Sequence, residues 1–176
     1  MEGMKTLLHL RTMFGFLFAF SLLSSFGCGA EATAVSQCPG PGCACTGSSC
    51  ACNAGASCQW VGNSTTGCNA QGGSCNFACL SGNQCTGSCQ GSCSGDCRNG
   101  STCNLTTGES GSFSCEKSTC TVTVGKSGSV SCNNSATCHV TCTGSCSVSC
   151  SGGSSCDLKC ATDSAPKTLT SSGNCP

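Results

Sequence analysis

The spacing of the cysteines restricts the fold of this chain more than any other feature. The six cysteines that begin at Cys79 are separated by 6, 4, 4, 4 and 6 residues, and the six that begin at Cys132 repeat these separations. The underlying period is 17 to 18 residues. A fixed period of this length is the signature of a repeat protein, in which each unit buries its apolar face by stacking on its neighbours.

Each repeat contains two five-residue segments in which cysteine or apolar residues alternate with polar ones, as in CSVSC from Cys146 to Cys150. An alternation with period two predicts a β-strand with one buried face. The first segment of each repeat, segment B, starts at Pro41, Cys58, Cys75, Cys93, Gly111, Gly128 and Cys146. The second, segment A, starts at Cys50, Cys68, Cys85, Cys103, Cys120, Cys138 and Cys156.

The sequence therefore predicts an all-β chain: a disulfide-rich β-solenoid (β-helix) of about seven 17-18-residue coils with two short parallel sheets. Glycine and serine between the segments supply the turns. Four regions are predicted: a signal peptide at 1-27, an N-terminal linker and cap at 28-40, the cysteine-rich repeat domain at 41-160, and a C-terminal tail and cap at 161-176.

The 25 cysteines among 176 residues indicate a disulfide scaffold. Large apolar residues are scarce after the first thirty positions, so cross-links have to replace an ordinary hydrophobic core. Most corner positions of the repeats hold either two cysteines or none, as at Thr107/Gly111 and Val124/Gly128, and bonded pairs would give this pattern. Sequence alone does not prove connectivity. The candidate pairs are Cys45/Cys50, Cys79/Cys85, Cys97/Cys103, Cys115/Cys120, Cys132/Cys138 and Cys150/Cys156 across the longer loop, Cys89/Cys93 and Cys142/Cys146 across the tight turn, and Cys160/Cys175 as a clamp on the tail.

The N-terminal region has the features of an export signal. An apolar run of eleven residues, Met13–Leu23, is too short to span a bilayer but suits the core of a signal peptide. The tetrapeptide SFGC that ends at Cys28 resembles a bacterial lipobox, although its serine and phenylalanine depart from that pattern. The resemblance implies cleavage after Gly27 and a lipid on Cys28. Ordinary signal cleavage after Ala30 or Ala34 and an uncleaved anchor helix are the alternatives.

These features predict an exported protein, either a lipoprotein of the cell envelope or outer surface or a secreted protein. Its membrane contact would come through the lipid on Cys28. The formal net charge is zero, and no run of basic residues indicates a nucleic acid as partner. The sequence names no surface ligand or protein partner.

The sequence predicts no catalytic residues, no cofactor and no metal site. The C-x-C spacing typical of metallothioneins occurs only at Cys43/Cys45 and Cys50/Cys52, and the dominant C-x3-C spacing is weak evidence for zinc. The C-x-x-C spacing of disulfide oxidoreductases does not occur. His139 is the only histidine after the signal region, and the acidic residues are scattered over different coils, so no catalytic triad is indicated.

The outward positions of stacked segments would form ladders of hydroxyl groups along the solenoid. Segment A contributes Thr106, Thr121, Thr123 and Thr141, and the row is interrupted by His139, Asp157 and Lys159. The T-x-T stretch at Thr121 and Thr123 is similar to that of disulfide-rich insect antifreeze proteins, which are narrow β-solenoids with a shorter coil. The resemblance implies that these two threonines bind ice. Segment B contributes the other candidate binding positions: Ser112, Ser114, Ser129, Ser131, Ser147 and Ser149.

We therefore predict a non-catalytic, exported and lipid-anchored structural or interaction module at a cell surface. An ice- or carbohydrate-binding solenoid is the first alternative, and thermal hysteresis or glycan binding would distinguish it. A metal-thiolate binding protein is the second alternative, and free thiols with stoichiometric metal would distinguish it.

Overall fold

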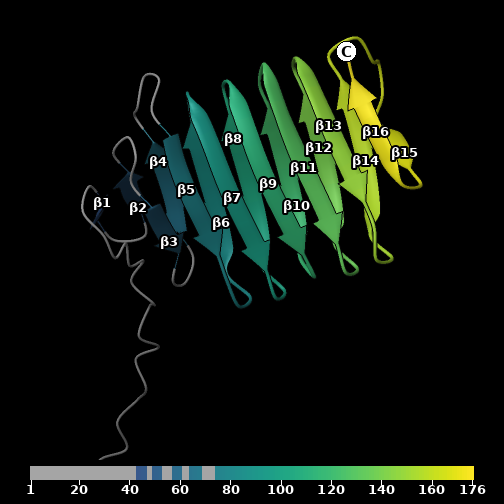
Figure 1. Cartoon of the computed structure of the whole chain (residues 1–176). Coiled ribbons are helices and arrows are strands. Elements are labelled where there is room, and N and C mark those ends of the chain that lie inside the picture. The colour runs from purple at the N-terminus through teal and green to yellow at the C-terminus, as the bar shows by residue number, and fades with distance from the viewer. Residues whose placement is uncertain (1–42, 47–48, 53–56, 61–63, 69–73) are drawn as a thin grey trace, which may run out of the picture. The chain divides into compact units, whose positions relative to one another are not determined.

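The computed structural model describes residues 43–46, 49–52, 57–60, 64–68 and 74–176. The predicted signal peptide, the lipobox with Cys28 and the linker to residue 40 lie outside these residues. The described part is an all-β solenoid of about five turns with two mainly parallel sheets and many disulfides (Figure 1). The fold class is as predicted, whereas the predicted seven coils are too many because the first repeats fold differently.

Two sheets face each other across the core, and the chain alternates between them. The nine-stranded sheet has the order β1 (Cys43–Thr46), β2 (Ser49–Cys52), β4 (Ser64–Cys68), β6 (Gln84–Cys89), β8 (Thr102–Thr107), β10 (Thr119–Val124), β12 (Thr137–Cys142), β14 (Ser155–Cys160) and β15 (Lys167–Leu169). The seven-stranded sheet has the order β16 (Ser172–Cys175), β13 (Ser145–Cys150), β11 (Ser127–Asn133), β9 (Ser110–Glu116), β7 (Ser92–Arg98), β5 (Ser74–Cys79) and β3 (Ser57–Trp60).

Equivalent residues of successive coils lie directly beside one another. β11 pairs in parallel with β9 and β13, which aligns Phe113, Val130 and Val148. Burial alternates along the strands, and β6 and β13 both follow a strict exposed–buried pattern. The cysteine and apolar positions of both sheets therefore point into one narrow core. The loops between the sheets reverse tightly, and Asn99 and Gly100 both have positive φ at one of them.

The first repeat does not form a coil. β1 lies in the first segment B and was predicted to join the sheet formed by the other segments B. It instead pairs antiparallel with β2 in the nine-stranded sheet. An end coil has no preceding neighbour, so the edge of β2 would expose unpaired backbone groups. The four-residue strand β1 covers that edge.

The second repeat is shifted relative to its prediction. Segment A was expected to start at Cys68, but Cys68 ends β4 and aligns with Cys52 on one side and Cys89 on the other. Likewise, Trp60 is the central residue of the predicted segment B that starts at Cys58, but it lies opposite Cys79, and Cys58 lies opposite Phe77. The register follows the alignment of Cys68 with Cys52 and Cys89.

Glycine in one coil makes room for the aromatic rings of its neighbours. The inward centre of β7 is Gly95, which lies between Phe77 of β5 and Phe113 of β9. A Cβ at Gly95 would lie 2.9 Å from Cδ1 of Phe113 and 3.3 Å from Cδ1 of Leu105. Phenylalanine in one coil therefore lies beside glycine in the next, and this alternation keeps the core closely packed.

The C-terminal residues cover the last coil. β15 pairs antiparallel with β14, and β16 pairs antiparallel with β13. A disulfide joins Cys160 to Cys175, and Leu169 packs against the core. Asp163 accepts hydrogen bonds from the Lys167 side chain at 2.8 Å and from the backbone N–H of Cys160 at 3.1 Å. These bonds hold the pKa of the Asp163 carboxyl below its ordinary value.

Candidate functional site

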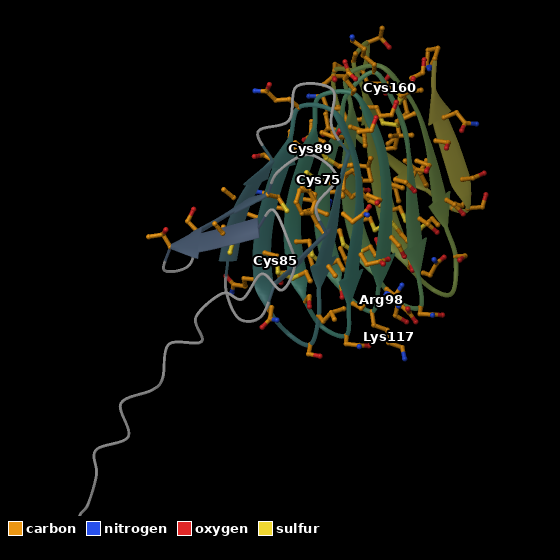
Figure 2. All side chains as sticks on the ribbon, turned by 60° about the vertical axis from the view of Figure 1, so that its left-hand side comes forward. Cys75, Cys85, Cys89, Arg98, Lys117 and Cys160 are labelled. Atoms are coloured by element: carbon orange, nitrogen blue, oxygen red, sulfur yellow. A yellow bond between two sulfur atoms is a disulfide. The ribbon has the colours of Figure 1, made fainter. Side chains whose placement is uncertain are left out.

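The corner that carries the longer loops holds a ladder of disulfides, here called the loop-corner column. Each bridge closes one loop, and its Cα atoms lie between 6.2 and 6.5 Å apart, within the usual range for disulfides. The bridges are Cys79–Cys85, Cys97–Cys103, Cys115–Cys120, Cys132–Cys138 and Cys150–Cys156. Each is a pair that the cysteine spacing predicts. Figure 2 shows Arg98 and Lys117 at this loop end of the coils.

The opposite corner, with the tight turns, carries the bridges Cys89–Cys93, Cys142–Cys146 and Cys160–Cys175, which are also predicted pairs. The predicted pair Cys45/Cys50 involves a Cys45 side chain outside the described residues, although the two Cα atoms are partners in the β1–β2 hairpin. Cys50, Cys52 and Cys75 are also disulfide-bonded. In Figure 2, Cys89 and Cys160 lie toward the end opposite to Arg98.

Two coils replace the tight-turn bridge by a branched side chain opposite glycine. Thr107 faces Gly111, and a Cβ at this glycine would lie 2.7 Å from Cγ2 of Thr107. Val124 faces Gly128, where the corresponding distance to Cγ1 of Val124 is 2.5 Å. The buried hydroxyl of Thr107 donates to the carbonyl of Gly91 at 2.9 Å. The branched side chain thus fills the volume that a disulfide fills elsewhere.

The serine face of the seven-stranded sheet contains the predicted positions Ser112, Ser114, Ser129, Ser131, Ser147 and Ser149. They lie in register on β9, β11 and β13. Sequence reasoning missed a third column on this face, formed by Ser110, Ser127 and Ser145 at the first strand positions. A shallow depression of about 360 Å³ runs over this face from Asn76 to Ser131. Its lining combines serine hydroxyls with the apolar Phe77 and Phe113, and Ser129 donates to Ser112 at 3.4 Å.

The threonine face lies on the nine-stranded sheet and extends beyond the predicted Thr106, Thr121, Thr123 and Thr141. Thr121 and Thr123 are part of a group of seven threonines on β8, β10 and β12: Thr102, Thr106, Thr119, Thr121, Thr123, Thr137 and Thr141. The strand pairing aligns them in columns, with Asn104 and His139 flanking Thr121 in the central one. Columns repeat about every 4.8 Å between coils and about every 6.7 Å along a strand. All seven side chains are exposed or half-buried.

His139 lies at the edge of the threonine face, as the sequence predicts for an outward position. Its Nδ1 lies 3.2 Å from Oδ2 of Asp157, and the hydroxyl of Thr168 donates to the other oxygen of Asp157 at 2.9 Å. The His139 side chain is 55% exposed. The backbone of β12 is paired on both sides, with β10 and β14, so its N–H groups are engaged in the sheet. The His139–Asp157 contact therefore lies at the surface, where such contacts contribute little to stability.

Clusters of cysteine sulfurs are the groups in the described residues that have metal-ligand geometry. Four sets of three sulfurs have all members within 4.8 Å of one another. Every member belongs to a disulfide. A disulfide sulfur is not a thiolate, and thiolate is the form that binds zinc or copper.

Across the described strands and loops, no helix is long and apolar enough to cross a membrane.

Comparison with protein families, with curated proteins and with solved structures gives no match for this chain.

Proposed function

We propose that the chain is an exported, non-catalytic structural or interaction module held at a cell surface by a lipid on Cys28. The observation that supports it is the disulfide column at the loop corner, together with further bridges at the tight-turn corner, which fix two faces rich in small hydroxyl residues on either side of a narrow core. Such cross-linking suits an oxidising compartment outside the cytoplasm. The backbone groups of both faces are engaged in strand pairing, so the faces offer side-chain hydroxyls and few ionisable groups.

The anchor is tested by expressing the full chain and a Cys28→Ala variant in a bacterial host that processes lipoproteins. The wild-type chain is expected in the detergent phase after phase separation, with an intact mass that includes acyl chains. The variant is expected in the aqueous phase, because it lacks the acylated thiol. An unacylated wild-type chain in the aqueous phase would rule out the anchor and leave a secreted module.

The threonine face favours ice as a second candidate ligand. Its hydroxyl and methyl groups repeat in two dimensions along and across the strands. The surface of an ice crystal is also periodic, so it can contact such a protein surface at many points at once. The serine face has the same periodicity but lacks the methyl groups. Binding of ice would therefore depend on the nine-stranded sheet and not on the seven-stranded one.

Two matched variants test this candidate. Thr121→Leu places a bulky group in the centre of the threonine face, and Ser129→Leu does the same on the serine face. We expect thermal hysteresis for the wild-type protein, loss of most of it in Thr121→Leu, and retention in Ser129→Leu. A wild-type protein without hysteresis, or an equal loss in both variants, would exclude ice binding through this face.

A further inference from the structure

The four sulfur clusters have a common composition. Each contains both sulfurs of one disulfide and a single sulfur from the disulfide of an adjacent coil, all within 4.8 Å of one another. In the loop-corner column, the sulfur of Cys156 lies beside the Cys132–Cys138 bridge. The remaining clusters place Cys79 beside Cys97–Cys103, Cys97 beside Cys115–Cys120, and Cys175 beside Cys142–Cys146.

This composition is that of a thiol–disulfide exchange reaction, in which one thiolate attacks one sulfur of a disulfide. We propose that the Cys150–Cys156 bridge of the loop-corner column passes a thiol to the adjacent Cys132–Cys138 bridge, and that a small-molecule thiol enters at Cys150. The activity is independent of the proposed anchor and of the hydroxyl faces, because it depends only on the buried sulfurs.

The burial of the column indicates where the thiol enters. Cys150 is 8% exposed, the highest value in the column, whereas Cys156 and Cys138 are 0% exposed. An external thiolate that bonds to the sulfur of Cys150 breaks the Cys150–Cys156 bond, and the electron pair leaves on Cys156. That leaving sulfur is the one within 4.8 Å of both Cys132 and Cys138. Attack at Cys150, the least buried cysteine of the column, thus releases a thiolate beside the next disulfide.

The second step conserves the number of disulfides. The Cys156 thiolate bonds to the sulfur of Cys132 or Cys138, the Cys132–Cys138 bond breaks, and the other cysteine of that pair leaves as a thiolate. The proton lost by the incoming thiol ends on this leaving sulfur. The net result is one mixed disulfide at Cys150, one new disulfide from Cys156 to Cys132 or Cys138, and one thiol on the other cysteine of that pair, in the adjacent coil.

A matched pair of variants tests the direction of transfer. Cys150→Ala and Cys156→Ala remove the same bridge, so both variants lose the same cross-link. Cys150→Ala leaves a thiol on Cys156, inside the cluster, whereas Cys156→Ala leaves it on Cys150, outside the cluster. The full-length variants are digested under acidic, non-reducing conditions, and their disulfide-linked peptides are identified by mass spectrometry.

We expect linkages from Cys156 to Cys132 or Cys138 in the Cys150→Ala variant, at a level on the order of tenfold above any linkage from Cys150 to those residues in the Cys156→Ala variant. Equal rearrangement in the two variants, or none in the first, would overturn the proposal. Near-ultraviolet circular dichroism establishes that both variants are folded.

A pulse experiment on the wild-type protein gives a test that does not require the variants to fold. The oxidised protein is treated briefly with 2-mercaptoethanol and then alkylated. The expected product has the mercaptoethanol adduct on Cys150 and the alkyl group on Cys132 or Cys138. Alkylation found on Cys156 alone would show that the thiol stays where it is released, and would refute transfer between coils.

Discussion

Gly111 is the position where a single added methyl group tests the packing of the tight-turn corner most directly. A Cβ there would lie 2.7 Å from Cγ2 of Thr107 and 2.8 Å from Cε2 of Phe113. Both contacts are shorter than van der Waals separation, so the core has to shift to accept the methyl. Overpacking of this kind costs about 1 to 3 kcal/mol. For a chain of this length we expect Gly111→Ala to lower Tm by roughly 2 to 12 °C.

A second substitution identifies the contact that causes the loss. Thr107→Ser removes the methyl nearest to the new Cβ and keeps the hydroxyl that donates to the carbonyl of Gly91. Alone it costs about 1 kcal/mol, because a buried methyl group is lost. In the double variant the methyl of Ala occupies the vacated space, so the combined loss is expected to be smaller than the sum of the single losses by about 1 kcal/mol.

Thermal and denaturant unfolding, followed by circular dichroism with all disulfides intact, measures these four proteins. Ser112→Ala is the control, because this neighbouring side chain is exposed on the serine face and its loss should change the free energy of unfolding by less than about 0.5 kcal/mol. A Gly111→Ala protein as stable as the wild type, or strictly additive effects in the double variant, would contradict the packing argument.

Three further outcomes follow from the cross-links and the C-terminal cap. Replacing Cys115 and Cys120 together by alanine is expected to lower the free energy of unfolding by about 2 kcal/mol, because the short closed loop restricts the unfolded chain only modestly; denaturant unfolding measures it. Asp163 has a lowered pKa when folded, so its contribution to stability is present above the pKa of the unfolded chain and is lost as pH falls through the folded pKa; in Tm measured against pH, Asp163→Asn should lose that acidic component. Leu169→Ala should cost about 1 kcal/mol and increase hydrogen exchange in β15 first, because this side chain packs the cap against the core.

The central coils could be predicted from the sequence because their inward positions are chemically restricted. Each position in the coil can be recognised by its residues: paired cysteines, or a glycine opposite a branched residue, mark the corners, and apolar residues mark the strand centres. The register of β11 with β9 and β13 follows from these positions. The region around Gly95 is harder to predict, because Gly95 of β7 and Gly87 of the preceding strand β6 both leave an inward centre without a side chain, and Phe113 and Leu105 pack beside Gly95.

The end coils could not be predicted from the repeat because they have a neighbour on one side only. The pairing of β1 with β2 satisfies an edge that no interior coil has, and the period carries no information about it. The shift of Cys68 has a different cause. Cysteine occurs at both corners of a coil, so the residue type alone does not show which corner Cys68 occupies. Its alignment with Cys52 and Cys89 in the sheet does.

The threonine face was underestimated because strands were taken to begin at the corner cysteine. β8, β10 and β12 begin one residue earlier, at Thr102, Thr119 and Thr137, where the chain already pairs with its neighbours. Starting from the cysteine therefore removed one of the three columns on each face. The omitted column was a larger share of the threonine face than of the serine face, because Asn104 and His139 interrupt the central column of threonines.

Serine and threonine are separated between the outward positions of the two sheets, and packing of the core does not explain this separation. Both faces are exposed strand surfaces with the same spacing, and threonine has the higher β-propensity on either of them. Nevertheless the outward positions of β9, β11 and β13 at 110, 112, 114, 127, 129, 131, 145, 147 and 149 are all serine, whereas those of β8, β10 and β12 are mainly threonine. Strand propensity would act on both sheets alike, so it does not account for a difference between them. We expect a difference in what each face contacts to account for it, and the matched leucine substitutions at Thr121 and Ser129 compare the two faces directly.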